Sequence, residues 1–89
     1  MIFITLAKWR KKPTKQTTAE GAKLVEQMVK EGGKILGWYW TLGRYDVVMI
    51  VEGKDEKAAM RTALRFGDLI STETLVAVTR EEAVKLLEQ

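Results

Sequence analysis

Residues 41–46, TLGRYD, decide how this chain folds. They lie between two strongly apolar runs, ILGWYW at 35–40 and VVMIV at 47–51. Two apolar runs separated by a short glycine-containing segment are typical of a β-hairpin, and a Gly-x pair suits a tight turn because glycine adopts positive φ without strain. We therefore predict strands at about 34–42 and 45–52, joined by Gly43-Arg44 as a two-residue turn.

This turn determines which residues share a face of the hairpin, because side chains alternate across a strand. It pairs Thr41 with Asp46, and Trp38 with Met49. One face is then almost wholly apolar and should lie under helices, with the tryptophans as core: Leu36, Trp38, Trp40, Leu42, Tyr45, Val47, Met49 and Val51. The other face is mixed: Ile35, Gly37, Tyr39, Thr41, Asp46, Val48, Ile50 and Glu52.

Strands are also expected at each end of the chain. Residues 2–9 alternate two apolar sets, which predicts a strand that is buried on both faces. A further strand is expected at about 70–78.

Three helices are expected between and after these strands. Thr17 and Glu20 have the spacing of a capping box and would open a helix that ends at glycines 32 and 33. Asp55 would cap an alanine-rich second helix, which we expect to pack over the tryptophans. Thr79 and Glu82 would open a short C-terminal helix. The order β-α-β-β-α-β predicts an α+β, ferredoxin-like domain over residues 1–89, with a four-stranded antiparallel sheet.

Two helices cover only one face of such a sheet. The mixed face is too apolar to stay in water, so a second copy is the natural cover, and two sheets packed face to face would form a dimeric α/β barrel. The chain itself is therefore the expected partner, as a homodimer or a larger even oligomer. The alternative is that the C-terminal helix folds back over the sheet.

Composition excludes several kinds of chemistry. The 89 residues contain no cysteine, histidine or asparagine, so thiolate and imidazole sites are absent, and we expect neither a metal nor a cofactor. The lack of cysteine and asparagine, together with abundant Lys and Glu, favours a thermophilic source. The first residues form an apolar run too short to span a membrane and unlike a signal peptide, so a cytoplasmic location is expected and no membrane partner.

Four residues of the mixed face are candidates for a small-ligand site: Tyr39, Thr41, Asp46 and Glu52. They would form the polar wall of an otherwise apolar pocket. Asp46 would then act as a base, if the protein is an enzyme, or would instead accept hydrogen bonds from Thr41 or from nearby amides and anchor the hairpin. Asp46 and Glu52 lie roughly 20 Å apart along one strand, which is too far to share a cation within one subunit.

A basic loop follows the first strand. Lys8, Arg10, Lys11, Lys12 and Lys15 carry five positive charges before the first acidic residue, and Trp9 lies among them. Lys8, Arg10, Lys11 and Lys12 could contact an anion, and aromatic residues beside basic ones also suit weak nucleic-acid binding through residues 8–15. A solvated loop with the tryptophans in the core is the simpler interpretation, and nucleic acid is therefore an unfavoured partner.

Two linked motifs resemble those of the GYD-domain proteins. The segment TLGRYD with a hydrophobic strand ending in Glu52 resembles the G-x-Y-D signature of that family, and STETLVA at 71–77 resembles its T-E-T-L-x-A segment. The resemblance implies a ferredoxin-like fold of the dimeric α/β-barrel group. It implies no particular activity.

Two looser resemblances suggest functions. The ligand-binding domain of Lrp/AsnC-type regulators also has a G-x-Y/F-D hairpin, which would imply oligomerisation and amino-acid binding between subunits. Cofactor-free monooxygenases share the barrel plan, but they often rely on His, Asn or Trp in the cleft, and this chain has neither His nor Asn. We therefore expect a small-ligand-binding or assembly module that is not an enzyme, with a cofactor-independent enzyme using Asp46 as the alternative.

Overall fold

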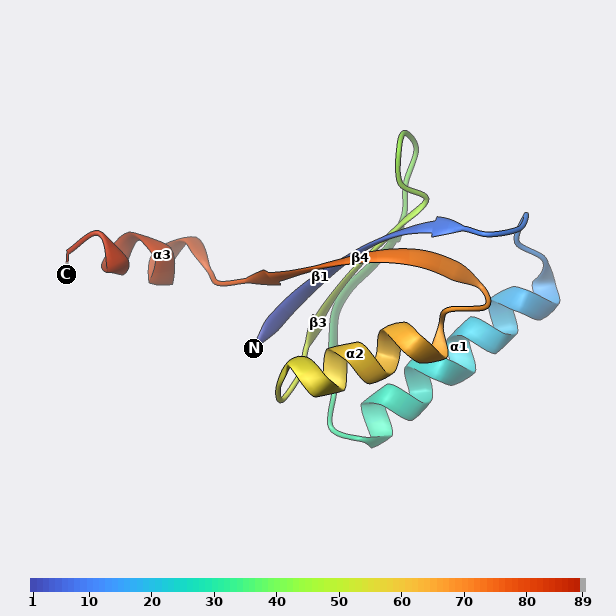
Figure 1. Cartoon of the computed structure of the whole chain (residues 1–89), viewed down its shortest axis with the longest axis horizontal. Coiled ribbons are helices and arrows are strands. Elements are labelled where there is room, and N and C mark those ends of the chain that lie inside the picture. Colours follow the sequence, from blue (N-terminus) through green and yellow to red (C-terminus); the bar gives the residue numbers. More distant parts are fainter. Residues whose placement is uncertain (89) are drawn as a thin grey trace.

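A computed structural model describes residues 1–88 as one sheet with helices on one side (Figure 1). The elements are β1 (Ile2–Trp9), α1 (Lys15–Lys30), β2 (Lys34–Trp40), β3 (Val47–Glu52), α2 (Glu56–Arg65), β4 (Ile70–Ala77) and α3 (Arg80–Leu86). The four strands are antiparallel in the order β2-β3-β1-β4. The predicted ferredoxin-like plan and the short C-terminal helix are confirmed.

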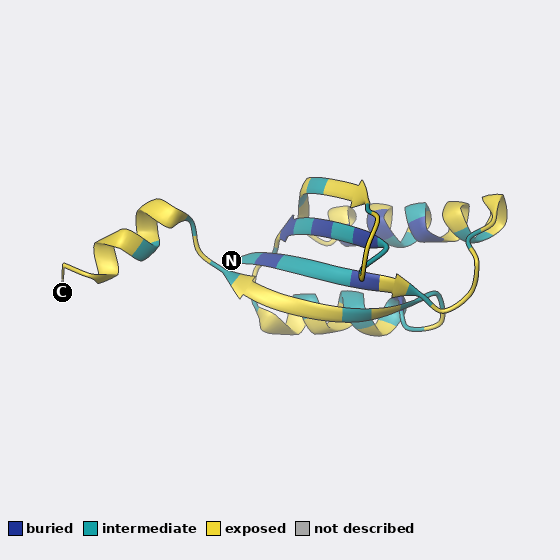
Figure 2. Cartoon of the chain, turned by 90° about the horizontal axis from the view of Figure 1, so that it is seen from above, coloured by how far each residue is buried: buried dark blue, intermediate teal, exposed yellow. Residues whose placement is uncertain are grey.

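The core lies between the sheet and α1. Phe3, Ala7, Val47, Met49 and Val51 alternate along the two central strands and are buried on the helix side. Met49 and Val51 form one cluster with Val25 and Met28 of α1 and with Phe66 after α2. The opposite side of the sheet has no helix over it, since α1 and α2 lie in one layer and α3 runs away from the sheet beyond β4 (Figures 1 and 2). The alternative, in which the C-terminal helix folds back over the sheet, is wrong. No helix among residues 1–88 is long and apolar enough to cross a membrane.

Two helix caps agree with the sequence prediction and one does not. The side chain of Asp55 accepts a hydrogen bond from the Ala58 amide at 2.9 Å, and Thr79 caps α3. The capping box of α1 instead consists of Thr14 and Thr17, whose side chains each accept a bond from the other's backbone N–H. The helix therefore begins earlier than predicted, because a threonine hydroxyl at the third helical position fills the role that was assigned to Glu20.

The hairpin keeps its predicted register from Gly37 to Trp40 but not its predicted turn. Trp40 pairs with Val47 and Trp38 with Met49, as expected. The strands stop at Trp40 and start again at Val47, so residues 41–46 form a loop in which the Thr41 amide donates to the Asp46 carbonyl at 2.8 Å. Gly43 has φ +103°, which explains a glycine at this position. Leu42 at the tip of this loop is exposed, so its predicted place under the helices is wrong.

A β-bulge at Leu36 reverses the faces at the start of β2. Ile35 pairs with Val51 and Gly37 with Ile50, so one residue is inserted between the two pairs. Ile35 consequently packs on the helix-side core and Leu36 is exposed, the reverse of the predicted arrangement. At Gly37 a Cβ atom would lie only 2.8 Å from the ring of Tyr39, so the exposed ring lies over the space that a side chain at position 37 would occupy.

The tryptophans are less buried than predicted. Trp38 is 41% exposed and Trp40 is 58% exposed, because β2 is an edge strand. Beside them lies the first part of α1, including Thr17, Thr18 and Gly21, and not the alanine-rich α2. Their predicted place beneath α2 is therefore wrong.

Candidate functional site

The side of the sheet opposite α1 and α2, which we call the open face, is apolar at its centre. Figure 2 looks onto this side, with the helices behind it. Its apolar side chains are half-buried or exposed, and along each strand they alternate with the residues that face the helices. The apolar residues of the open face are Ile2, Ile4, Leu6, Val48, Ile50 and Leu75. Polar residues at its hairpin end are Lys8 and Glu73. The open face is the first candidate for a functional surface.

Asp46 joins the hairpin loop to the end of β1. Its Oδ2 atom accepts a hydrogen bond from the Trp9 amide at 2.9 Å, and its own amide donates to the Ala7 carbonyl at 2.8 Å. Thr41, the partner suggested by the pairing, instead donates from Oγ1 to the Tyr45 carbonyl at 2.7 Å. Asp46 and Thr41 are thus both engaged in holding the loop in place.

The four predicted ligand-wall residues do not form one cluster in the single chain. Tyr39 lies on the open face against Gly37 and is 56% exposed. Glu52 is exposed at the far end of β3, where it pairs with Ile2 and Lys34. Within residues 1–88 no group of three or more acidic residues is placed to hold a metal ion.

Tyr45 lies on the open face, whereas the predicted strand pairing places it on the helix side. Its hydroxyl donates to Oε2 of Glu73 at 2.7 Å, and Lys8 Nζ is 6.0 Å from its ring centroid. The hydrogen bond to the Glu73 carboxylate, with a smaller contribution from desolvation, raises the pKa of the Tyr45 phenol. The prediction is wrong because residues 41–46 leave the strand geometry on which the alternation depends.

A second candidate site lies on the helix side of the sheet, at the end of β1. We call it the tryptophan cleft, and its walls include Trp9, Trp38, Trp40, Lys11 and Lys12. Its volume is about 120 Å³. Trp9 and Trp40 meet edge to face, with ring centroids 4.9 Å apart and an interplanar angle of 74°. The sequence analysis considered an aromatic platform but favoured core packing of Trp38 and Trp40, because the chain lacks the glycine-flanked aromatic motif of RNA-recognition modules.

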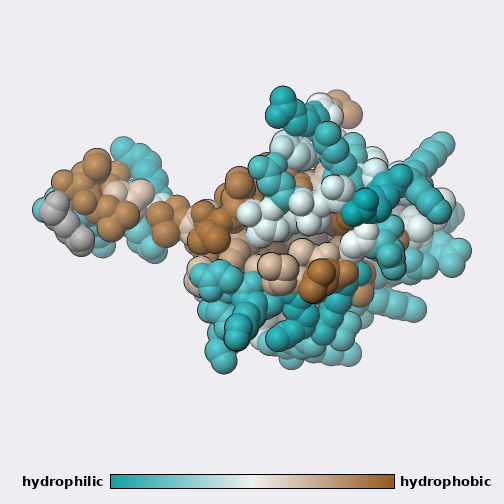
Figure 3. Space-filling view, viewed as in Figure 1, coloured by the Kyte–Doolittle hydropathy of each residue, from teal (hydrophilic) through white to brown (hydrophobic). Residues whose placement is uncertain are grey.

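A third and larger hollow, the α2 cleft, separates α2 from β1 and β4. Its volume is about 250 Å³, and Figure 3 shows it as a recess between β4 and α2. Small residues line both sides: Ala58, Ala59 and Ala63 of α2, and Thr5, Thr72 and Thr74 of the sheet. Sequence reasoning missed this cleft, although the alanine stripe opposite a row of threonines was a usable signal.

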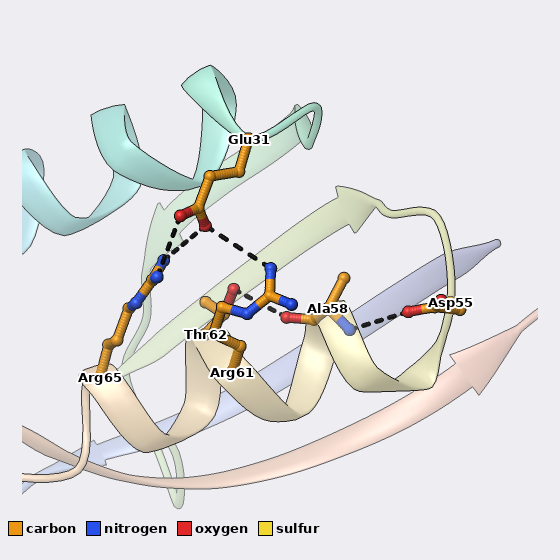
Figure 4. A network of polar contacts seen from close by, with 6 residues as sticks. All are labelled: Glu31, Asp55, Ala58, Arg61, Thr62 and Arg65. Atoms are coloured by element: carbon orange, nitrogen blue, oxygen red, sulfur yellow. Dashed lines mark hydrogen bonds and ion pairs between the residues drawn. The ribbon is translucent and has the colours of Figure 1, made fainter.

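An ion-pair cluster joins the end of α1 to α2 (Figure 4), and Glu31 and Arg61 of this cluster also line the α2 cleft. Arg65 donates to both carboxylate oxygens of Glu31, at 2.6 and 3.0 Å, and Arg61 approaches Oε1 at 3.8 Å. The hydrogen bonds from Arg65, and the charges of both arginines, lower the pKa of Glu31. The cluster positions α2 and leaves Arg61 only weakly paired.

Comparison with known proteins identifies the family. The GYD domain profile matches residues 3–87, nearly the whole chain. The chain belongs to the GYD domain family. No relative of this GYD domain was found among curated proteins.

Solved structures share the fold of this GYD domain. A hypothetical protein from Pyrococcus horikoshii, PHS023, has a TM-score of 0.53 at 15% identity, over 92% of this chain and 95% of its own. The structure of FFRP-DM1 has a TM-score of 0.52 at 18% identity, over 88% of this chain and 100% of its own. Identities this low establish a common fold and nothing further.

Proposed function

We propose that this GYD domain is a non-enzymatic module that works as a homodimer, assembled through its open face into a dimeric α/β barrel. The observation that carries the proposal is the bare apolar centre of that face, formed by side chains such as Ile4, Val48 and Ile50. Soluble monomers rarely leave so large an apolar sheet surface in water. None of the helices α1, α2 and α3 covers it.

A second copy is the partner that suits the open face best. The face carries one charge of each sign near the hairpin, Lys8 and Glu73, so two copies can meet there without net repulsion. Pairing would place Tyr39 and the Tyr45–Glu73 hydrogen bond at the interface.

We further propose that a small molecule binds inside the barrel. Tyr39 is the member of the predicted set whose exposed ring is available on the open face, and Glu52 would contribute at the far end. Thr41 and Asp46 would support the site indirectly, through the loop that they hold. A role for Asp46 as a catalytic base is less favoured, because Asp46 lines neither the tryptophan cleft nor the α2 cleft.

Light scattering coupled to size exclusion tests the assembly. At micromolar concentration we expect a dimer or a larger even oligomer for the unmodified chain, and a folded monomer for Ile50→Lys, because a lysine at the centre of the interface would be desolvated without a partner. Leu64→Lys is the matched control, since Leu64 is an exposed leucine on α2, and it should leave the oligomer intact. A monomeric unmodified chain would refute the proposal.

Measuring the melting temperature in the presence of candidate metabolites tests whether a ligand binds inside the barrel. A metabolite that binds between the two sheets raises the melting temperature of the dimer by mass action. The shift should disappear in the Ile50→Lys monomer and weaken in Tyr39→Ala. A broad amino-acid and metabolite panel without any shift would leave assembly as the function and remove the ligand from the proposal.

A further inference from the structure

We propose that the tryptophan cleft binds a small planar aromatic anion. The aromatic ring would stack on the exposed tryptophans, and the anionic group, a carboxylate or a phosphate, would meet Lys11 and Lys12. This site is on the helix side of the sheet, opposite the open face, so the inference does not depend on dimerisation.

The tryptophan side chains that form the aromatic wall of the cleft are partly exposed to water, which is energetically unfavourable. Tryptophan has the largest side chain, and leaving more than half of Trp40 in water forgoes much of its favourable burial. Its edge-to-face contact with Trp9 fixes the angle between the two rings. A third ring can therefore stack there on a preformed surface, which limits the entropy lost on binding.

Hydrogen bonds hold the backbone on both sides of Trp9. The Asp46 carboxylate accepts from the Trp9 amide at 2.9 Å. One residue later, the Arg10 amide donates to the Leu69 carbonyl at 3.1 Å, and its guanidinium Nε donates to the Gly67 carbonyl at 2.6 Å. The start of the basic loop is thus fastened to the turn between α2 and β4. The cleft is preorganised, and Asp46 acts in it as a positioning residue.

The electrostatics of the cleft favour an anion. Lys11 and Lys12 line it, are exposed, and form no ion pair among residues 1–88. Thr17 and Thr18, from the start of α1, also line it, and the first turn of this 16-residue helix contains no acidic residue. The helix N-terminus adds partial positive charge to that of the lysines. Asp68 is the acidic residue on the wall, so the two lysines outnumber it.

Tryptophan fluorescence provides a direct test, because all three tryptophans of the chain line the cleft. The probes are adenosine monophosphate and benzoate, with adenosine and benzamide as neutral analogues and ribose phosphate and cyclohexanecarboxylate as non-aromatic anions. We expect saturable quenching by at least one aromatic anion, with an affinity about tenfold above that of its neutral analogue and of its non-aromatic counterpart. Binding of only one of the two anions shows which combination of ring and anionic group the cleft accepts, and either result supports the site.

Matched variants separate the cleft from general charge. The double variant Lys11→Gln/Lys12→Gln should lose about tenfold in affinity for the anion. Lys54→Gln/Lys57→Gln removes the same charge near the start of α2 and should leave binding unchanged. Trp40→Ala should abolish stacking, and the circular dichroism spectrum will show whether the variant remains folded.

Three results would overturn the inference. They are the absence of saturable quenching, equal losses in both lysine double variants, and a length-dependent preference for single-stranded oligonucleotides far above that for the mononucleotide. The last would assign the surface to nucleic acid. Repeating the titration on Ile50→Lys keeps the two proposals apart, since the cleft should still bind the anion saturably in a monomer, whether or not the open face dimerises.

Discussion

The helices α1 and α2 lie on the same side of the sheet but pack against it very differently. α1 buries Gly21, Val25 and Met28, whereas α2 buries none of its residues and has the 250 Å³ cleft beneath it. The difference follows from side-chain length. Valine and methionine on α1 reach the sheet, but the alanines of α2 face threonines, and the space between remains unfilled. Amphipathic pattern alone therefore predicts which face a helix turns inward, not how closely it packs.

Truncating a buried side chain of α1, the helix that packs closely against the sheet, should have the largest effect on stability. Met28→Ala removes a buried side chain that contacts the core of Met49 and Val51, and should lower the free energy of unfolding by about 2–4 kcal/mol. Met60→Ala, on the exposed side of α2, is the control and should change stability by less than about 1 kcal/mol. Urea denaturation measures both, and similar losses would remove the distinction between the helices.

Lengthening a side chain of α2 that faces the α2 cleft should have the opposite effect and increase stability. Ala59→Leu places apolar atoms in the α2 cleft and should raise stability by about 0.5–2 kcal/mol. The same measurement applies. A loss of stability would show that α2 has no room for a larger residue, and that the cleft does not persist in solution.

A glycine in the middle of α1 offers a smaller gain. A Cβ atom at Gly21 would lie 3.8 Å from Phe66 Cε1, an ordinary contact distance. Gly21→Ala should therefore stabilise the protein by about 0.5–1 kcal/mol through the lower helix propensity of glycine. Destabilisation in thermal unfolding would mean that α1 packs too closely against Phe66 to accept a methyl group.

The smallest effect is expected at the bridge between the helices. The pKa of Glu31 is lowered in the folded protein, mainly by its hydrogen bonds to Arg65. The Glu31–Arg65 ion pair therefore stabilises the fold above the usual carboxyl pKa of 4.5. This contribution is lost as the pH falls through the lowered pKa of Glu31. Arg65→Gln should flatten that acid-side loss in a denaturation series across pH. It should also speed hydrogen exchange in α2 more than in α1, and equal acceleration in both helices would contradict the positioning role.

The sequence predicted the elements that depend on local pattern. The order of strands and helices, the cap at Asp55 and the register of Trp38 with Met49 all follow from periodicity and spacing over a few residues. The capping residue of α1 was missed because the true box uses two threonines, Thr14 and Thr17, where the rule looks for an acidic partner.

The misplaced site residues depend on features that periodicity does not contain. One inserted residue at Leu36 reversed the face of Ile35, and the widened loop carried Tyr45 to the open face. The exposure of Trp40 depends on strand order, because β2 is at the edge of the sheet. An anchoring role for Asp46 was one of the two sequence-based interpretations, but its actual partner, the amide of Trp9, is 37 residues away in the chain and could not be predicted from the hairpin pairing.

Two consecutive residues of the hairpin loop connect the two sides of the sheet. Tyr45 bonds to Glu73 on the open face, and Asp46 holds the backbone of Trp9, whose ring lines the cleft on the helix side. A displacement of this loop must therefore strain contacts on both sides at once. If a partner copy and an aromatic anion each favour one position of the loop, linkage requires that each alters the affinity for the other by the same factor.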